Sequence, residues 1–407
     1  MIELADLTAQ TRERIEEIGT ADLVLATARA GAAELSRIAA DTREAIGKLY
    51  SPTRTLLIHS GEAIPEIVQS DSVRTLAMPA LREADPLKAI ADAYRAVFSV
   101  ARNLNARAIV MLVSDADSIT PQWIYGLARP ILELDFDLVT PYYAHAPSEG
   151  LLNSGVIAPF MRALYGRRIQ HPLGPDFGFS AKFVDRLLNE PGERARTRSL
   201  ASITVDAICE GFEICQANVG VRRYPAADWA NQSSVLAQIL GPLFVETEYH
   251  AARWQRIRGS QPVSTFGEAA SGPGDGEAID VRRLIDSFQL GHRNLQEIWS
   301  AVLPPGTLLE LSKMAKQPRE HFHMPDRTWA RIIYDFALGH RLRLINPDHL
   351  LRAMTPLYLA WVASFCLDAA VADETSAARR GEDLALAFEA AKPYLVSRWR
   401  WPDRFNP

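Results

Sequence analysis

The spacing of apolar and polar positions predicts repeated strand–helix pairs in the first half of the chain. Apolar runs at residues 22–28, 54–60 and 73–78 have the length and composition of strands. Between the first two, residues 31–50 repeat apolar positions at helical spacing, and a second stretch of this kind begins at Pro86. This alternation predicts an α/β domain with a mainly parallel sheet covered on both faces. Ligands of such sheets bind at the carboxyl ends of the strands.

The pattern changes from mixed to helical along the second half of the chain. Strands are predicted at residues 136–143 and 213–224, with a turn-rich stretch over residues 172–180 between them. After a glycine-rich stretch, helical spacing takes over, as in residues 329–337. The predicted organisation is an amino-terminal helix over residues 1–19, an α/β domain over residues 20–258, a linker over residues 259–280 and an α-helical domain over residues 281–407.

One stretch places two carboxylates at the end of a predicted strand. Residues 109–113 are apolar, Asp115 and Asp117 follow, and Thr120 with Pro121 then predicts a capped helix start. Side chains two residues apart in an extended chain point the same way, so both carboxylates converge on one polar object. A divalent ion such as Mg²⁺ takes one or two carboxylates together with substrate phosphates. The setting favours a site for a metal and a diphosphate over the alternative, in which Asp-Ala-Asp only begins a loop.

Composition limits the class of protein and its partners. A chain of 407 residues predicts two domains, and 48% hydrophobic with 23% charged residues is typical of packed globular proteins. A formal net charge of -5 argues against nucleic acid as the main partner. The cysteines, Cys209, Cys215 and Cys366, form no CxxC pair, which fits a reducing cytoplasm. The apolar run at residues 355–367 is shorter than the roughly 20 residues of a membrane span, so we expect a buried helix there.

Several segments resemble a known enzyme family. "VSDADSITPQWI" resembles the metal-binding DxD segment of nucleotide-sugar glycosyltransferases with the GT-A fold, in particular the retaining mannosylglycerate, glucosyl-phosphoglycerate and glucosylglycerate synthases. "HPLGPDFGFS", "ASITVDAICEGFEICQANVGV" and "HFHMPDRTWARIIYDFAL" continue the resemblance in order along the chain. It implies a GT-A Rossmann-like domain followed by an α-helical domain. It also implies transfer, with retention, of a hexose from GDP- or UDP-hexose to a small polar acceptor such as glycerate, with Mg²⁺ or Mn²⁺ as cofactor and a compatible solute as product.

The resemblance also implies roles for individual residues. Asp115 would meet the ribose of the nucleotide, Asp117 the metal ion, and Leu173 the transferred sugar. Asp206 matches the acid near the sugar and the acceptor, where a buried carboxylate stabilises a developing positive charge. The positions that match the family's donor-binding residues are Asp115, Asp117, Pro172, Leu173, Gly174 and Asp176.

The chain departs from the family at several polar positions. Pro175-Asp176 replaces Gly-Glu, and Tyr224 stands where the family has a metal-binding histidine. Thr140 and Glu83 stand where the family has the basic residues that hold the acceptor carboxylate and the donor phosphates. These changes leave two functions open: an active glycosyltransferase, or a catalytically degenerate relative that binds nucleotide-sugar or a protein partner without transfer.

Four further residues are candidates for the binding site. His171 could reach a phosphate or make only local hydrogen bonds. Arg222 and Arg223 could bind a diphosphate or form a solvated pair, and Trp229 could line the cleft. The apolar faces of the helical region fit either core packing or a homodimer contact.

Overall fold

The computed structural model contains a unit built on a β-sheet and a unit built from helices. Unit 1 comprises residues 1–145, 169–223 and 263–273, and unit 2 comprises residues 146–168, 224–262 and 274–407. The structure describes residues 9–27, 31–60, 72–78, 86–113, 116–191, 194, 199–224, 229, 231–272, 278–371 and 374–402.

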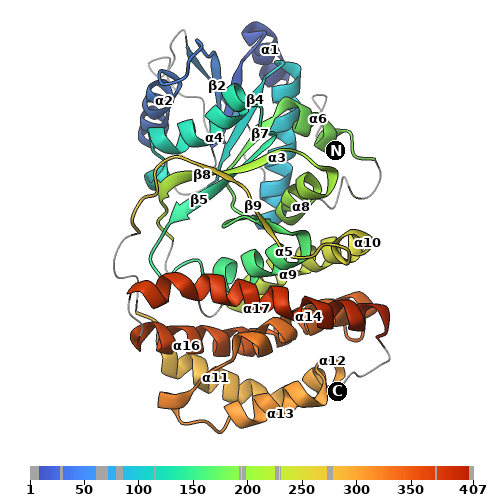
Figure 1. Cartoon of the computed structure of the whole chain (residues 1–407). Coiled ribbons are helices and arrows are strands. Elements are labelled where there is room, and N and C mark those ends of the chain that lie inside the picture. Colours follow the sequence, from blue (N-terminus) through green and yellow to red (C-terminus); the bar gives the residue numbers. More distant parts are fainter. Residues whose placement is uncertain are drawn as a thin grey trace. The chain divides into compact units, whose positions relative to one another are not determined.

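Unit 1 is organised around an eight-stranded sheet with the strand order β10-β8-β5-β7-β4-β1-β2-β3 (Figure 1). β7 is antiparallel to its neighbours β4 and β5, and the other pairs are parallel. This confirms the predicted α/β class with a mainly parallel sheet. The strands are β1 (Leu23–Thr27), β2 (Thr55–Ser60), β3 (Val73–Met78), β4 (Ala108–Leu112), β5 (Leu138–Ala144), β7 (Phe177–Ser180), β8 (Ile214–Val221) and β10 (Ser264–Phe266).

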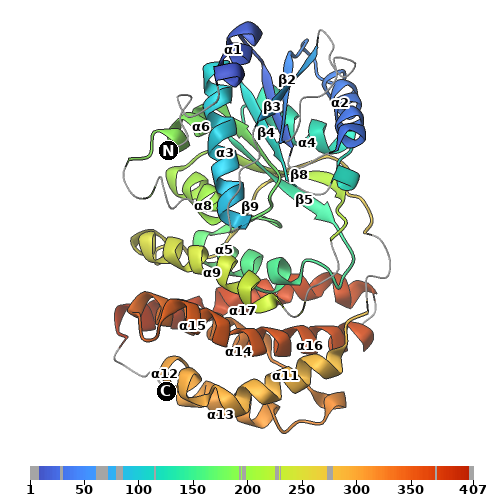
Figure 2. The same ribbon diagram turned by 180° about the vertical axis from the view of Figure 1, so that it is seen from behind.

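Helices cover both faces of this sheet. α2 and α4 pack on one face and α3 and α6 on the other, as the two opposite views show (Figures 1 and 2). The central strands β1 and β4 are buried at every position because both of their faces carry helices. The helices of unit 1 are α1 (Ala9–Ile18), α2 (Ala32–Ile46), α3 (Pro86–Asn103), α4 (Pro121–Leu134), α6 (Ala181–Leu188) and α8 (Leu200–Glu210).

Two strands of the eight-stranded sheet occur where the sequence predicts none. The end of the turn-rich stretch forms β7, in which Gly178 allows a close approach to α4: a Cβ atom there would lie 2.2 Å from the Leu127 carbonyl oxygen. The stretch predicted as a linker contains β10, which adds to the edge of the sheet beside β8. Both are short strands, four and three residues long, in glycine-containing sequence, and such composition normally indicates loops.

Unit 2 consists mainly of packed helices. α14 packs against α17, and α11 against α16 (Figure 2). Asn346 caps α15, because its side chain accepts hydrogen bonds from Asp348 N–H and His349 N–H. The elements are the π-helix η4 (Asn153–Ile157), α5 (Ala158–Tyr165), β6 (Arg167–Arg168), α9 (Gln232–Tyr249), α10 (Ala251–Trp254), β9 (Gln261–Pro262), α11 (Val281–Asn294), α12 (Gln296–Val302), α13 (Pro305–Met314), η5 (Arg319–His321), α14 (Asp326–Leu342), α15 (Pro347–Ala353), α16 (Thr355–Val371) and α17 (Glu374–Arg400).

Residues 146–168 fold with the helices and not with the sheet. The buried Arg162 pairs with Glu382 and Glu389 of α17, with N–O distances of 2.6 Å in each pair. Trp329 Nε1–H donates to the Gly155 carbonyl oxygen at 2.8 Å. The two units therefore divide the chain differently from the predicted contiguous domain over residues 20–258.

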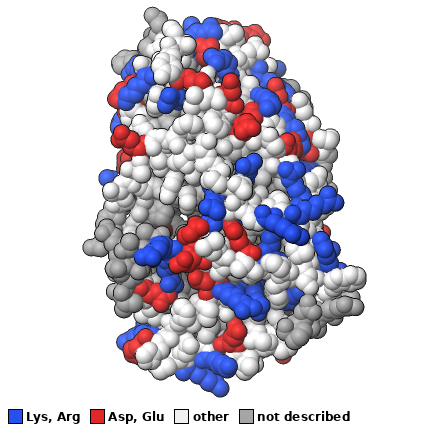
Figure 3. Space-filling model, viewed as in Figure 1, with Lys and Arg blue, Asp and Glu red and all other residues white. Residues whose placement is uncertain are grey.

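Among the described residues, Pro347–Ala369 is long and apolar enough to cross a membrane by length and composition, and 67% of its most apolar window is buried inside the structure. A largely buried core helix has the same properties, so this is weak evidence for a span. Basic and acidic side chains are interspersed over the face drawn in Figure 3.

Candidate functional site

The predicted metal segment lies at the carboxyl end of β4. This strand is followed by the 3-10 helix η3 (Ala116–Ser118), on which Asp117 is exposed. Thr120 caps α4 by accepting a hydrogen bond from Trp123 N–H at 3.3 Å. A buried strand, an exposed carboxylate and a capped helix thus follow one another, while Asp115 lies outside the described residues.

Two arginines follow β8, and the second of them, Arg223, lies beside η3. Arg223 N–H donates to Ser118 Oγ at 3.2 Å, which joins the chain after β8 to the residue next to Asp117. Arg223 is exposed, and the half-buried Arg222 places its guanidinium carbon 4.8 Å from the centre of the Tyr143 ring. The backbone of Arg223 therefore lies beside the segment that carries the exposed carboxylate, and arginines in this region would suit a site for a metal and a diphosphate.

The loop predicted to wrap a sugar is a tight turn packed against β5. Gly174 N–H donates to the His171 carbonyl oxygen at 3.1 Å, and Thr204 of α8 donates to the Pro172 carbonyl oxygen at 2.6 Å. Gly174 lies so close to Pro141 that a Cβ atom would be 2.5 Å from the proline Cγ. Leu173, at the tip of the turn, is half-buried. The turn is thus held from two sides and presents Leu173 at its tip.

Asp176 connects this loop to the metal segment. Its side chain is fully buried, and its Oδ1 accepts a hydrogen bond from Val113 N–H at 2.7 Å. Its Oδ2 accepts a hydrogen bond from the Tyr143 hydroxyl. The structure therefore joins the loop to the first residue after β4, 63 positions earlier in the chain. Asp176 therefore links the two segments from a buried position, and a direct contact between Asp176 and a sugar donor stays a prediction.

His171 is buried beside the loop, and only one of its two ring nitrogens has a hydrogen-bond partner among the described residues. It is 4% exposed, and its Nδ1 lies 3.5 Å from Tyr143 N, which donates to it. Burial, followed by the charges of His145 and Arg222, holds the pKa of His171 well below its usual value of 6.5. Its Nε2 has no hydrogen-bond partner among the residues that the structure describes. A neutral ring that accepts at Nδ1 carries its hydrogen at Nε2, so His171 has an N–H group available for a ligand or water.

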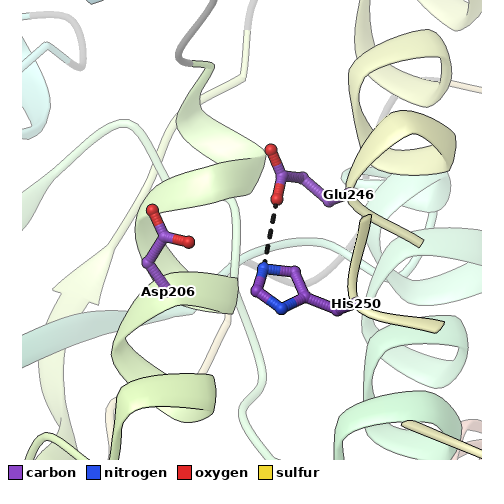
Figure 4. A group of neighbouring side chains, drawn as sticks. All are labelled: Asp206, Glu246 and His250. Carbon is purple, nitrogen blue, oxygen red and sulfur yellow. Dashed lines mark ion pairs between the residues drawn. The ribbon is translucent and has the colours of Figure 1, made fainter. Parts of the chain in front are cut away.

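Asp206, the predicted catalytic acid, projects from α8 (Figure 4). It is 1% exposed, and its Oδ1 accepts a hydrogen bond from Arg194. Within unit 2, Glu246 and His250 form an ion pair at 3.5 Å, one helical turn apart, also drawn in Figure 4.

The positions that depart from the family have different environments. Thr140 is fully buried in the sheet, with its hydroxyl 3.3 Å from the Cys215 carbonyl oxygen, so it faces the core. Tyr224 and Trp229 belong to unit 2 and are half-buried. Glu83 lies outside the described residues.

The side chains at the end of β4 fit a divalent ion that is bound together with a phosphate ligand. Asp117 supplies one carboxylate that is open to solvent. Mg²⁺ keeps several waters and needs only one or two carboxylates when phosphates complete its shell. The donor set therefore favours an ion that binds with a nucleotide diphosphate over a preformed metal cage.

The chain was compared with known families, curated proteins and solved structures. No family model and no curated protein matches it. Two similar structures are of glucosyl-3-phosphoglycerate synthase from Mycobacterium tuberculosis. One is in complex with Mn²⁺, UDP and phosphoglyceric acid, and shows 16% identity, coverage of 57% of this chain and 82% of that chain, and a TM-score of 0.39. The other is in complex with Mn²⁺, UDP-glucose and phosphoglyceric acid, and shows 16% identity, coverage of 57% and 84%, and a TM-score of 0.41.

A third similar structure is described as a mycobacterial protein, with 19% identity, coverage of 57% of this chain and 77% of that chain, and a TM-score of 0.39. Further complexes of the synthase contain Mg²⁺ with UDP, or phosphoglyceric acid alone. The similarity to these structures is partial, and it is low in both sequence and backbone.

Proposed function

We propose that this chain is a metal-dependent, retaining glycosyltransferase. It would move a hexose from GDP- or UDP-hexose to a small polar acceptor such as glycerate, with Mg²⁺ or Mn²⁺. The observation that carries the proposal is the bond from Val113 N–H to Asp176, which brings the exposed Asp117 segment and the Pro172–Gly174 turn to the same end of the sheet. Two motifs that the family resemblance assigns to one donor site thereby meet in space.

Each group at this end of the sheet has a role in the proposal. Asp117 binds the ion, which when bound neutralises charge on the leaving diphosphate. Arg222 and Arg223 orient the diphosphate through charge-assisted hydrogen bonds. The turn with Leu173 at its tip encloses the hexose and excludes water from it. Asp206, buried in α8, would stabilise the positive charge that develops on the sugar.

A thermal shift experiment tests donor binding. The protein is heated with UDP, GDP, UDP-glucose or GDP-mannose, each with and without Mn²⁺. A donor at about 100 times its dissociation constant raises the free energy of unfolding by about 3 kcal/mol. We expect this stabilisation for one nucleotide and its sugar conjugate, and only with the ion present. Equal melting temperatures under all conditions would contradict the proposal.

One observation favours the second candidate, a degenerate relative that binds nucleotide-sugar without transfer. Asp206 already accepts a hydrogen bond from Arg194, so in this arrangement its charge is partly neutralised. Release of free nucleotide after addition of glycerate or a phosphorylated glycerate separates the two functions. Donor binding without release would support the degenerate relative.

A further inference from the structure

Tyr143, which neither the sequence pattern nor the family resemblance identifies, lies at a bulge in the sheet. The pairing of β5 with β8 changes register here: Tyr142 pairs with Asn218 and Tyr143 with Gly220. Gly220 has a φ of 106°, a conformation that L side chains rarely adopt. A bulge of this kind re-aims the side chains beside it. Tyr143 is turned inward and is 2% exposed.

From this position Tyr143 contacts residues on both sides of the turn and one of the two arginines after β8. Its hydroxyl donates to Asp176 after the turn, and its backbone N–H donates to His171 before the turn. Its ring lies 4.8 Å from both the His171 ring centre and the Arg222 guanidinium carbon. The Trp123 ring of α4, the helix that follows the metal segment, lies 5.3 Å away.

These contacts determine how the neighbouring groups are presented. Because Tyr143 N–H occupies Nδ1 of His171, the ring hydrogen is left on Nε2, the nitrogen without a partner in the described part of the chain. Asp176 also accepts a hydrogen bond from Val113 N–H, so the side chain of Asp176 links the Tyr143 hydroxyl to the residue that follows β4. One side chain thus links the turn, the histidine and the arginine.

We infer that Tyr143 is a positioning residue of the donor site, which holds His171, the turn and Arg222 in the arrangement that receives the hexose of a nucleotide-sugar. The inference rests on the proposed function. It assigns Tyr143 and Asp176 to the part of the site that contacts the sugar, whereas Asp117 serves the nucleotide diphosphate and its ion.

The test compares affinity for the nucleotide with affinity for its sugar conjugate, by calorimetry with Mn²⁺. Tyr143→Phe keeps the ring and the backbone N–H, and removes only the bond to Asp176. We expect affinity for the hexose conjugate to fall on the order of 10-fold to 100-fold, because a turn without this bond no longer holds the sugar-binding groups in position. Affinity for the nucleotide alone should stay within about two-fold of wild type.

Tyr125→Phe is the matched control, because the half-buried Tyr125 also carries an arginine over its ring, at 5.7 Å, but lies on α4 away from the turn. It should change neither affinity. If Tyr143→Phe does not fold, Asp176→Asn replaces the charged acceptor of this bond with a neutral amide and should show the same split. Where both fold, the double variant should lose less than the sum of the two single losses, because both changes weaken the same bond.

The outcomes separate the inference from the proposed function. Metal-dependent binding by wild type together with a Tyr143→Phe variant that behaves like Tyr125→Phe would overturn the inference alone. An equal loss for nucleotide and conjugate would also overturn it, because a general structural defect does not select the sugar. Failure of the wild type to bind any nucleotide with Mn²⁺ would overturn the proposed function itself.

Discussion

Gly174→Ala should weaken binding of the sugar donor without unfolding the protein. The new Cβ would lie 2.5 Å from Pro141 Cγ, 3.1 Å from Pro141 Cδ and 3.3 Å from the His171 carbonyl oxygen. The closest approach is about 1 Å short of the roughly 3.5 Å at which carbon atoms attract each other. Pro141 is part of β5, so the turn is the element that must move, by about that distance. A displacement of about 1 Å in a positioned site can cost on the order of 100-fold in activity.

The assay measures melting temperature and donor affinity on the same samples. We expect donor affinity to fall by about 10-fold or more, while the free energy of unfolding falls by less than the roughly 1 to 3 kcal/mol typical of an overpacked core. Gly306→Ala on α13 is the control, because no atom lies within 4 Å of its Cβ position. It should leave binding unchanged and stabilise the helix by up to about 1 kcal/mol. Unchanged donor affinity in a folded Gly174→Ala variant would refute the assignment of the turn to the sugar.

Three further predictions concern stability. Gly178→Ala should destabilise the protein by about 3 kcal/mol in urea unfolding, because its Cβ would meet the Leu127 carbonyl oxygen at 2.2 Å and neither backbone can move cheaply; a loss below about 0.5 kcal/mol would contradict this close packing. Arg162→Met should cost about 3 kcal/mol, because it leaves two glutamates of α17 without their buried partner, and a neutral result in the same assay would show that the pairs contribute little. Burial lowers the pKa of His340 to about 4, so between about pH 4 and 6.5 the folded chain binds fewer protons than the unfolded chain, and the free energy of unfolding falls as the pH drops through that window. His340→Gln should remove up to about 3 kcal/mol of this pH dependence. An identical pH dependence of unfolding in both proteins would refute the assignment to His340.

Local patterns in the sequence predict most elements of the fold. Periodicity identifies the buried strand at the metal segment, and cap chemistry identifies the start of α4 at Thr120. These features depend on residues close together in the chain, so spacing and propensity are sufficient to find them.

What the sequence does not predict depends on contacts between distant residues. β7 is four residues long and forms because Gly178 lets the strand approach α4. The membership of residues 146–168 in the helical unit depends on partners such as Glu382, more than 200 positions away from Arg162. Tyr143 is one aromatic residue in a strand, and its importance follows from a bulge that no pattern of apolar positions reveals.

Mn²⁺-dependent binding of a nucleotide-sugar, measured by calorimetry on wild type and Asp117→Ala, tests the proposed function most directly. Asp117 is exposed on η3, so its replacement should leave the melting temperature unchanged. We predict that wild type binds the nucleotide-sugar with Mn²⁺ and only weakly without it, and that Asp117→Ala loses the part of the affinity that depends on the ion. Tight binding of Mn²⁺ without nucleotide that survives Asp117→Ala would place the ion elsewhere in the protein and contradict the proposed site.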